Sequence, residues 1–185
     1  MSEWYQDLPA TWARVWDELE QGLADVSHPA RYPAFASVGA AGAELRTLRL
    51  REVDRTAATV AFYTDLASDK VAELRASPMA SVMIWCPASE FQVRLRVRTR
   101  IESGPDLEPI WAQLPDIARL PYGGTPAPGT PLAAPEDHTR TVSFDRFARI
   151  ACSVEDVDTV SLAEPVHHRA RFLRKCGFNG QWLAP

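Results

Sequence analysis

The sequence predicts an α+β protein built around an antiparallel β-barrel. Roughly eight short β-type runs lie between residues 35 and 183, most of them separated by hairpin-type turns. A few segments with helical spacing of apolar residues interrupt these runs. The length of 185 residues suits a single domain, so residues 1–185 are expected to form one.

The first expected element is a helix within residues 4–26. Asp7 is its predicted N-cap, and Pro9 is tolerated in the first turn. Trp12 and Trp16 are expected to pack in the core rather than line a site. The apolar residues of the helix recur on one face: Leu8, Trp12, Val15, Trp16, Leu19 and Leu23.

Strands and a short helix follow. The helix is expected over residues 68–77, with Ser68 as N-cap and Pro78 after its end. The neighbouring strands and turns are predicted in this order: strand 35–38, turn 39–42, strand 45–53, turn 54–56, strand 59–64, then strands 80–86 and 91–101.

The second half contains a broken helix and a proline-rich loop. Pro115 should kink or split a helix over residues 107–120. Residues 121–135 hold five prolines and are expected to be an ordered extended loop over the surface. Asn179-Gly180 predicts a two-residue hairpin turn. The remaining strands are expected at residues 149–154, 157–162, 168–174 and 181–183.

Composition limits the function classes. A net charge of −4 and a pI near 5.6 argue against a general nucleic-acid binder. The N-terminus shows no secretory signal, and the longest nearly apolar run, residues 79–86, is too short to span a bilayer. We therefore expect a cytoplasmic protein without membrane partners. The three cysteines, Cys86, Cys152 and Cys176, are expected to be small buried hydrophobic residues. No metal site is predicted.

Arginines gather on one predicted strand. Residues 91–101 alternate strictly, so their polar members share one face: Gln92, Arg94, Arg96, Arg98 and Arg100. A solvated outer face would explain most of them. Four cations on one face nevertheless repel one another unless acids or an anionic ligand neutralise them. Arg46, Arg49 and Arg51 add further positive charge, which favours a phosphate ester as ligand.

Lys70 gives a sharper signal. It lies in the first turn of the helix that begins at Ser68, where the helix dipole disfavours a cation but favours a bound phosphate. No Walker-type loop and no Gly-x-Gly-x-x-Gly turn is present in the sequence, so a P-loop or Rossmann site is not expected.

Three ordered motifs resemble the FMN-binding split barrel of the pyridoxamine 5'-phosphate oxidase family. They are Arg46-Thr47-Leu48-Arg49-Leu50-Arg51, then Phe62-Tyr63-Thr64-Asp65-x-x-Ser68-x-Lys70, then Gln92-Val93-Arg94. The resemblance implies an antiparallel split β-barrel with peripheral helices, FMN as cofactor and a homodimer with FMN at its interface. The loop around Gly129 and Thr130 would then approach the partner's flavin.

The resemblance also implies roles for individual residues. Arg46 and Lys70 match the phosphate ligands of the family, and Ser68 belongs to the same motif as Lys70. The other matches are Thr47, Leu48 and Arg49 beside the flavin, Tyr63 and Thr64 at the ribityl chain and phosphate, Gln92 at the flavin and Arg171 near its ring.

Departures from the family pattern concern the substrate site. His167-His168-Arg169 replaces the Arg-x-His of the oxidases, and their Tyr, Arg and Ser contacts have no evident counterpart between Asp106 and Ala134. Asp69 also replaces a basic neighbour of the lysine. The sequence thus predicts a divergent FMN-dependent oxidoreductase acting on a small molecule, with His167, His168 and Arg169 as candidate catalytic residues. The alternatives are a non-catalytic flavin sensor, carrier or scavenger, and a split barrel that uses a deazaflavin or haem.

Overall fold

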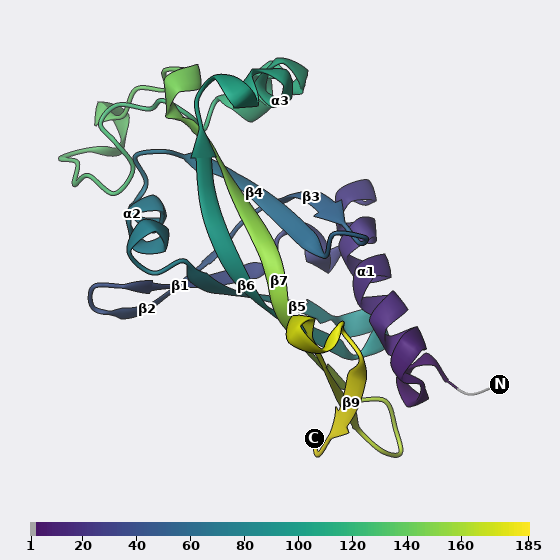
Figure 1. Ribbon diagram of the computed structural model, residues 1–185. Helices are drawn as coiled ribbons and strands as arrows, with labels where there is room; N and C mark the ends of the chain where they lie inside the picture. Colours follow the sequence, from purple (N-terminus) through teal and green to yellow (C-terminus); the bar gives the residue numbers. More distant parts are fainter. Residues whose placement is uncertain (1–2) are drawn as a thin grey trace.

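The computed structural model describes residues 3–185. Within them the strands form one nine-stranded sheet in the order β2-β1-β5-β6-β7-β4-β3, and β8 and β9 extend from β7 (Figure 1). All pairs are antiparallel, which confirms the predicted α+β fold class. The strands are β1 (Ala34–Gly39), β2 (Gly42–Thr47), β3 (Leu50–Asp54), β4 (Thr59–Asp65), β5 (Met79–Cys86), β6 (Phe91–Ser103), β7 (Phe147–Ser161), β8 (His168–Leu173) and β9 (Gly180–Leu183).

The barrel is split between β2 and β3. The prediction of one strand over residues 45–53 is wrong, because the chain changes partners at Leu48: β2 pairs with β1, and β3 pairs with β4. β2 and β3 are the first and the last strand in the order β2-β1-β5-β6-β7-β4-β3, yet only Leu48 and Arg49 separate them in the chain. Two residues span about 10 Å at most between their flanking strands. The two sheet edges therefore approach each other where Leu48 packs against the core.

The two strands predicted at residues 149–154 and 157–162 are one strand, β7. On the β6 side, Arg96 pairs with Asp156 and Val97 pairs with Val154, so Glu155 is an extra residue in a β-bulge. The bulge resets the alternation of inward and outward side chains, and this made the strand look interrupted in the sequence. The first half of β7 pairs with β4 and the second half with β8.

The helices largely follow the sequence prediction. The long helix α1 (Leu8–Ala24) begins after Asp7, whose carboxylate accepts a hydrogen bond of 2.8 Å from the Ala10 N–H. Pro115 splits the second helical segment, as predicted, into α3 (Glu108–Gln113) and α4 (Asp116–Arg119). Ser68 does stand before α2 (Asp69–Ala76), but its hydroxyl does not cap the helix, because it donates to the Asp65 carbonyl oxygen at 2.7 Å.

The expected Asn179-Gly180 hairpin turn is wrong. Gly180 is already part of β9, and the chain turns earlier, through a 3-10 helix (Arg174–Cys176) and Gly177 at φ 64°. Phe178 stacks on Trp12 of α1, with ring centroids 4.7 Å apart, and this packing favours the longer turn. A side chain at Gly180 would collide with the Phe172 ring, since its Cβ would lie 2.5 Å from a ring carbon.

The barrel interior is closed by α1. Trp16 is fully buried, which confirms its expected packing role. Cys86 and Cys152 are buried as predicted, but Cys176 is exposed, because it lies in the turn before β9. In residues 3–185, no helix combines the length and the apolar character needed to cross a membrane.

The proline-rich loop is ordered against the sheet, as expected. The N–H of Gly123 donates to the Asp65 carboxylate at 2.9 Å, and Arg146 donates to the same carboxylate at 2.8 Å. Tyr122 is buried in a small aromatic cluster with Phe147. The same cluster includes Ile110 and Trp111 of α3, and α3 lies at one end of the molecule (Figure 1).

Candidate functional site

Three of the predicted ligand residues meet where β4 leads into α2. The ammonium group of Lys70 donates to the Thr64 hydroxyl oxygen at 3.3 Å, and the Thr64 and Ser68 hydroxyls lie 3.1 Å apart. Thr64 and Ser68 are buried, whereas Lys70 is half-buried in the first turn of α2. Burial lowers the pKa of Lys70, and the neighbouring charge of Arg46 lowers it further. An anion placed here would offset both costs.

These residues line a cavity of about 420 Å³, which we call the Lys70 cavity. This volume lies in the range of small-molecule sites, and the lining combines cations with aromatic and aliphatic surface. Burial and the like charge of Arg51 lower the pKa of Arg49. The cavity therefore suits a ligand with both an anionic group and a planar apolar body. Its wall consists of Leu48, Arg49, Arg51, Tyr63, Thr64, Asp65, Ser68, Lys70, Ile117, Ala118, Pro121, Tyr122 and Pro128.

Arg46 lies in an adjoining cavity and already has an anionic partner. Its guanidinium forms an ion pair of 3.0 Å with Glu73 of α2 and also donates to Ser37. The adjoining cavity shares Ser68, Lys70 and Pro128 with the Lys70 cavity. Arg46 is thus near the expected phosphate position, but it is partly neutralised.

Only some of the strand residues predicted to lie beside the flavin line the Lys70 cavity. Leu48 and Arg49 line it, whereas Thr47 is exposed on β2 and does not. Tyr63 also lines it, and its hydroxyl donates to the Glu52 carboxylate at 2.9 Å. Burial and this hydrogen bond raise the pKa of Tyr63, which therefore remains a neutral phenol. The tip of the proline-rich loop approaches the start of α2 in its own chain, since a Cβ at Gly129 would lie 2.8 Å from the Asp69 carboxylate.

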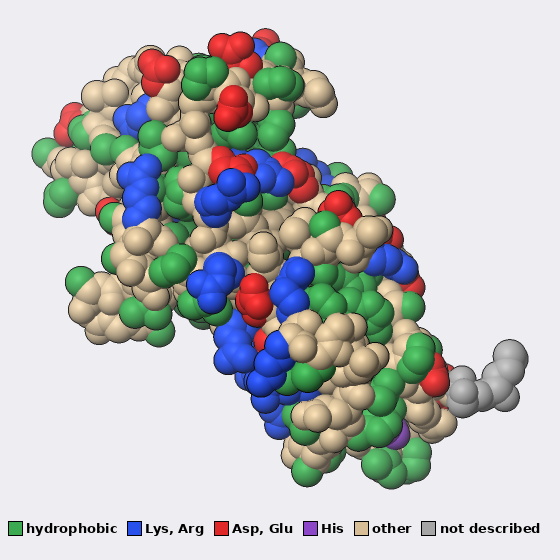
Figure 2. All heavy atoms as spheres, viewed as in Figure 1, with side chains coloured by type: hydrophobic (Ala, Val, Ile, Leu, Met, Phe, Trp, Pro, Cys, Tyr) green, Lys and Arg blue, Asp and Glu red, His purple; other side chains and the backbone are tan. Residues whose placement is uncertain are grey.

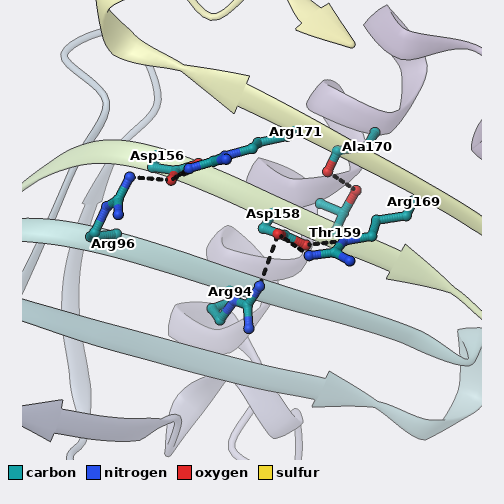
Figure 3. Close-up of polar contacts among 8 residues, drawn as sticks. All are labelled: Arg94, Arg96, Asp156, Asp158, Thr159, Arg169, Ala170 and Arg171. Carbon is teal, nitrogen blue, oxygen red and sulfur yellow. Dashed lines mark hydrogen bonds and ion pairs between the residues drawn. The ribbon is translucent and has the colours of Figure 1, made fainter. Parts of the chain in front are cut away.

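Arg169 and Arg171 lie in a different cavity, between β5, β6, β7 and β8. Figure 3 shows its two buried aspartates, each shared by two arginines. Asp156 accepts hydrogen bonds from Nη2 of Arg96 at 2.5 Å and of Arg171 at 2.6 Å. Asp158 accepts them from Nη2 of Arg94 at 2.8 Å and of Arg169 at 2.9 Å. The repulsion predicted among the arginines of β6 is thus reduced by acids on β7.

This arginine cavity and the Lys70 cavity share no residue among those described. Gln92 lies on β6 beside Trp85 and Val160 and lines neither cavity. Figure 1 places α2 and β9 in separate parts of the molecule, and Arg171 belongs to β8, which pairs with β9. Within one chain, the predicted ligand residues therefore do not meet in a single cavity.

The two candidate histidines differ in their surroundings. His167 is exposed just before β8. His168 is half-buried between two aromatic residues, with its ring centroid 5.2 Å from that of Tyr5 and 6.1 Å from that of Trp182. This packing suits a structural role for His168, and His167 is the more exposed of the two.

Sequence reasoning missed part of the Lys70 cavity. Tyr122 lies inside the stretch that seemed to lack a site residue, and burial raises its pKa. Ile117 of α4 also lines the cavity, although its side chain is otherwise exposed. No local pattern marks this contribution, because Tyr122 packs against Phe147, which is distant in the sequence.

A half-buried histidine lies near one of the buried cysteines. His28 and Cys86 both contact the Glu18 carboxylate, at 2.9 and 3.1 Å. However, Nδ1 of His28 accepts a hydrogen bond from the Ala30 N–H, so Nε2 carries the proton that faces Glu18. This arrangement satisfies the three side chains internally and leaves no free nitrogen lone pair on His28 for a metal.

Comparisons with known proteins agree with the fold. The family model described as "Pyridoxamine 5'-phosphate oxidase, FMN-binding domain" matches residues 11–103. A pyridoxamine 5'-phosphate oxidase-related, FMN-binding protein from Nostoc punctiforme is 24% identical, with a TM-score of 0.75 over 94% of this chain and 96% of that one. PhzG from Burkholderia lata, solved with tetrahydrophenazine-1-carboxylic acid, is 15% identical, with a TM-score of 0.75 over 100% and 98%. No curated protein matches the chain.

Proposed function

Because the chain belongs to the pyridoxamine 5'-phosphate oxidase family of FMN-binding domains, we propose that it binds FMN in the Lys70 cavity and acts as an FMN-dependent oxidoreductase on a small-molecule substrate. The family match covers the strands and helix that build this cavity up to β6. The observation that carries the proposal is the convergence of Lys70, Thr64 and Ser68 at the start of α2.

The donor set fits FMN. A phosphate dianion needs cationic and hydroxyl donors, and Lys70, Thr64 and Ser68 provide them together with the N-terminal N–H groups of α2. Leu48 and Tyr122 offer the apolar surface that a ring system requires. Burial lowers the pKa values of both Lys70 and Arg49, so a bound anion would stabilise the charged form of each.

Bound FMN would supply a ring that accepts a hydride from the substrate. The chain's own residues would bind and orient it: Lys70, Thr64 and Ser68 at the phosphate, and Leu48 and Arg49 beside the ring. We propose Arg171 as the arginine near the ring and Arg169 as its neighbour at the substrate. His167 remains the candidate proton donor, since it is solvent-exposed beside Arg169.

We further propose a homodimer in which the second copy completes the site. Arg171 and Gln92 lie apart from the Lys70 cavity within one chain. If they contact the flavin, they must come from the partner. The altered residues His167-His168-Arg169 would then give the shared site a substrate different from that of the typical oxidases.

Release of the cofactor from the purified protein tests the proposal. Mass spectrometry after denaturation should identify FMN, and the absorption spectrum of the intact protein should be that of a flavin. Substrate-dependent bleaching of this spectrum would separate an oxidoreductase from a flavin carrier. FAD, a deazaflavin or haem as the released ligand would contradict the proposal.

A further inference from the structure

Trp85 of β5 differs from the other tryptophans because it has no aromatic neighbour. Each of the other five tryptophans packs against an aromatic ring: Trp4, Trp12, Trp16, Trp111 and Trp182. Within residues 3–185, Trp85 takes part in no aromatic pair and no cation–π contact. Trp85 is 39% exposed, although its neighbours Ile84 and Cys86 are buried. It therefore presents a large apolar ring on the outer face of the sheet.

The strand register places Trp85 directly beside one of the expected flavin contacts. Trp85 pairs with Gln92 of β6, and residues directly opposite each other in antiparallel strands share one face of the sheet. The same line of partners continues across β7, β8 and β9. We call it the Trp85 row, and it consists of Trp85, Gln92, Val160, Arg169 and Leu183. Arg169 also lines the arginine cavity, so the Trp85 row borders that cavity.

The Trp85 row combines apolar surface with hydrogen-bonding groups. Its three apolar members alternate with Gln92 and Arg169. Met83, two residues before Trp85 on the same face, is also 39% exposed. Figure 2 shows lysine and arginine side chains gathered along one face of the molecule, with hydrophobic side chains beside them. Apolar surface with a few fixed polar groups is typical of sites that bind a small planar molecule.

We propose that the indole of Trp85 packs against the flavin ring that the partner copy binds. The inference rests on the proposed function, in which Gln92 reaches the flavin from the second copy. The Cβ atoms of opposite residues such as Trp85 and Gln92 lie about 4.5–5.5 Å apart, so a ring that touches Gln92 is within reach of the indole. Contact between two aromatic rings is favourable beyond the area that it buries. The flavin would thus cover an aromatic surface that the chain itself leaves exposed.

Replacement of Trp85 in the FMN-loaded protein tests the inference. An indole in contact with a flavin donates an electron to the excited ring and so quenches its fluorescence. Bound FMN should therefore fluoresce weakly in the wild type and more strongly in Trp85→Leu. The affinity for FMN should fall about threefold to tenfold in Trp85→Leu, because one aromatic contact is lost. Trp85→Phe should keep most of the affinity yet fluoresce like Trp85→Leu, since a phenyl ring packs against the flavin without donating the electron.

Trp182→Leu is the matched control. Trp182 is exposed to a similar degree, at 44%, but it pairs with the buried Ala170 and so lies on the opposite face of the sheet from the Trp85 row. This substitution should change neither the fluorescence of bound FMN nor its affinity. Should Trp85→Leu fold poorly, Trp85→Phe still provides the fluorescence comparison.

Subunit exchange shows which copy supplies the indole. Trp85→Leu is mixed with Lys70→Ala, so that in a mixed dimer the site with an intact Lys70 faces the copy with an intact Trp85. The weak fluorescence of the wild type should then return. Strong fluorescence that persists after mixing, or equal fluorescence of bound FMN in the wild type, Trp85→Leu and Trp85→Phe, overturns the inference while the proposed function stands. A purified protein that neither contains nor takes up FMN overturns both.

Discussion

Arg46 donates two hydrogen bonds from Nη2 to the carboxylate of Glu73, at 3.0 and 3.2 Å. Both side chains are largely buried, with exposures of 22% and 13%. The arginine that most resembles a phosphate ligand is therefore held by an acid from α2, the helix whose first turn carries Lys70. Glu73 should weaken the attraction of this corner for a phosphate dianion.

Replacement of Glu73 should consequently tighten FMN binding. Glu73→Gln keeps the shape of the side chain and an acceptor for Arg46 but removes the negative charge, and affinity should rise about threefold to tenfold. Fluorescence quenching of FMN on binding measures the change. Glu44→Gln is the control, since Glu44 lines the same cavity but only its backbone carbonyl contacts Arg46. Unaltered affinity in Glu73→Gln would place the phosphate away from Arg46.

Replacement of Lys70 should weaken FMN binding but stabilise the flavin-free protein. Lys70→Ala should weaken FMN binding by about 1.5–3 kcal/mol, or roughly tenfold to 150-fold, and Lys70→Arg should weaken it less. The pKa of Lys70 is lowered by burial, so its charged form costs stability in the flavin-free protein. Lys70→Met should therefore raise the melting temperature of the flavin-free protein at neutral pH.

The pH dependence of stability tests whether the charged form of Lys70 destabilises the flavin-free protein. A depressed lysine pKa costs stability below the folded pKa, and the cost disappears as the pH rises through the folded pKa toward the ordinary value of 10.5. The advantage of Lys70→Met over the wild type should thus shrink as the pH rises. Lys175→Met is the control, because Lys175 is exposed. A lower melting temperature for Lys70→Met at neutral pH would contradict the argument.

The protein should be a poor oxidase of pyridoxamine 5'-phosphate. His167-His168-Arg169 replaces the Arg-x-His of the family it belongs to, and Arg169 is held by Asp158 through hydrogen bonds of 3.2 and 2.9 Å. Loss of two charge-assisted contacts of about 1.5–3 kcal/mol each would lower kcat/KM by two to four orders of magnitude. A steady-state assay of the FMN-loaded protein measures this. Turnover at ordinary enzymatic efficiency would show that the substrate site is not altered.

Each flavin should be shared by two copies of the chain. Light scattering should give twice the chain mass of 20.5 kDa. Lys70→Ala and Arg171→Ala should each lose FMN when pure, but a mixture that exchanges subunits should recover it, because one of the two sites in a mixed dimer has both residues. A monomer with stoichiometric FMN, or no recovery on mixing, would rule out the shared site.

Only one cysteine should react in the native protein. Burial, together with the hydrogen bond to Glu18, raises the pKa of Cys86 to about 12, and burial also raises the pKa of Cys152. Both thiols are therefore protonated at neutral pH and inaccessible, whereas Cys176 is exposed. Iodoacetamide should add one label to the native protein and three after denaturation, as counted by mass spectrometry. Labelling of Cys176→Ser at the wild-type rate would disprove this assignment.

Local signals predicted most of the fold. The apolar stripe of α1, its Asp7 cap and the break at Pro115 are properties of neighbouring residues, so the sequence alone identified them. The strand errors at Leu48 and Glu155 have a common cause, because partner exchange and bulges depend on strands distant in sequence. A local pattern contains no information about which strand lies opposite.

The same distinction holds for the site. Thr64, Ser68 and Lys70 lie within seven residues, and the sequence placed them together. Contacts between segments far apart in the chain were not predicted: the Arg46–Glu73 pair, the insertion of Tyr122 into the cavity and the aspartates of β7 that hold Arg94 and Arg96. The charge of a residue can be read from sequence, but whether another chain segment neutralises it cannot.

The two-residue link between β2 and β3 would couple ligand binding in the Lys70 cavity to the closure of the barrel at these two strands. Leu48 and Arg49 are the covalent join between the two ends of the main strand path, and they also line the Lys70 cavity. A ligand that contacts them and the start of α2 resists separation of these edges. Opening of the barrel and release of the ligand are therefore thermodynamically linked, and mutations that loosen β2 or β3 should weaken binding even where they touch no ligand atom.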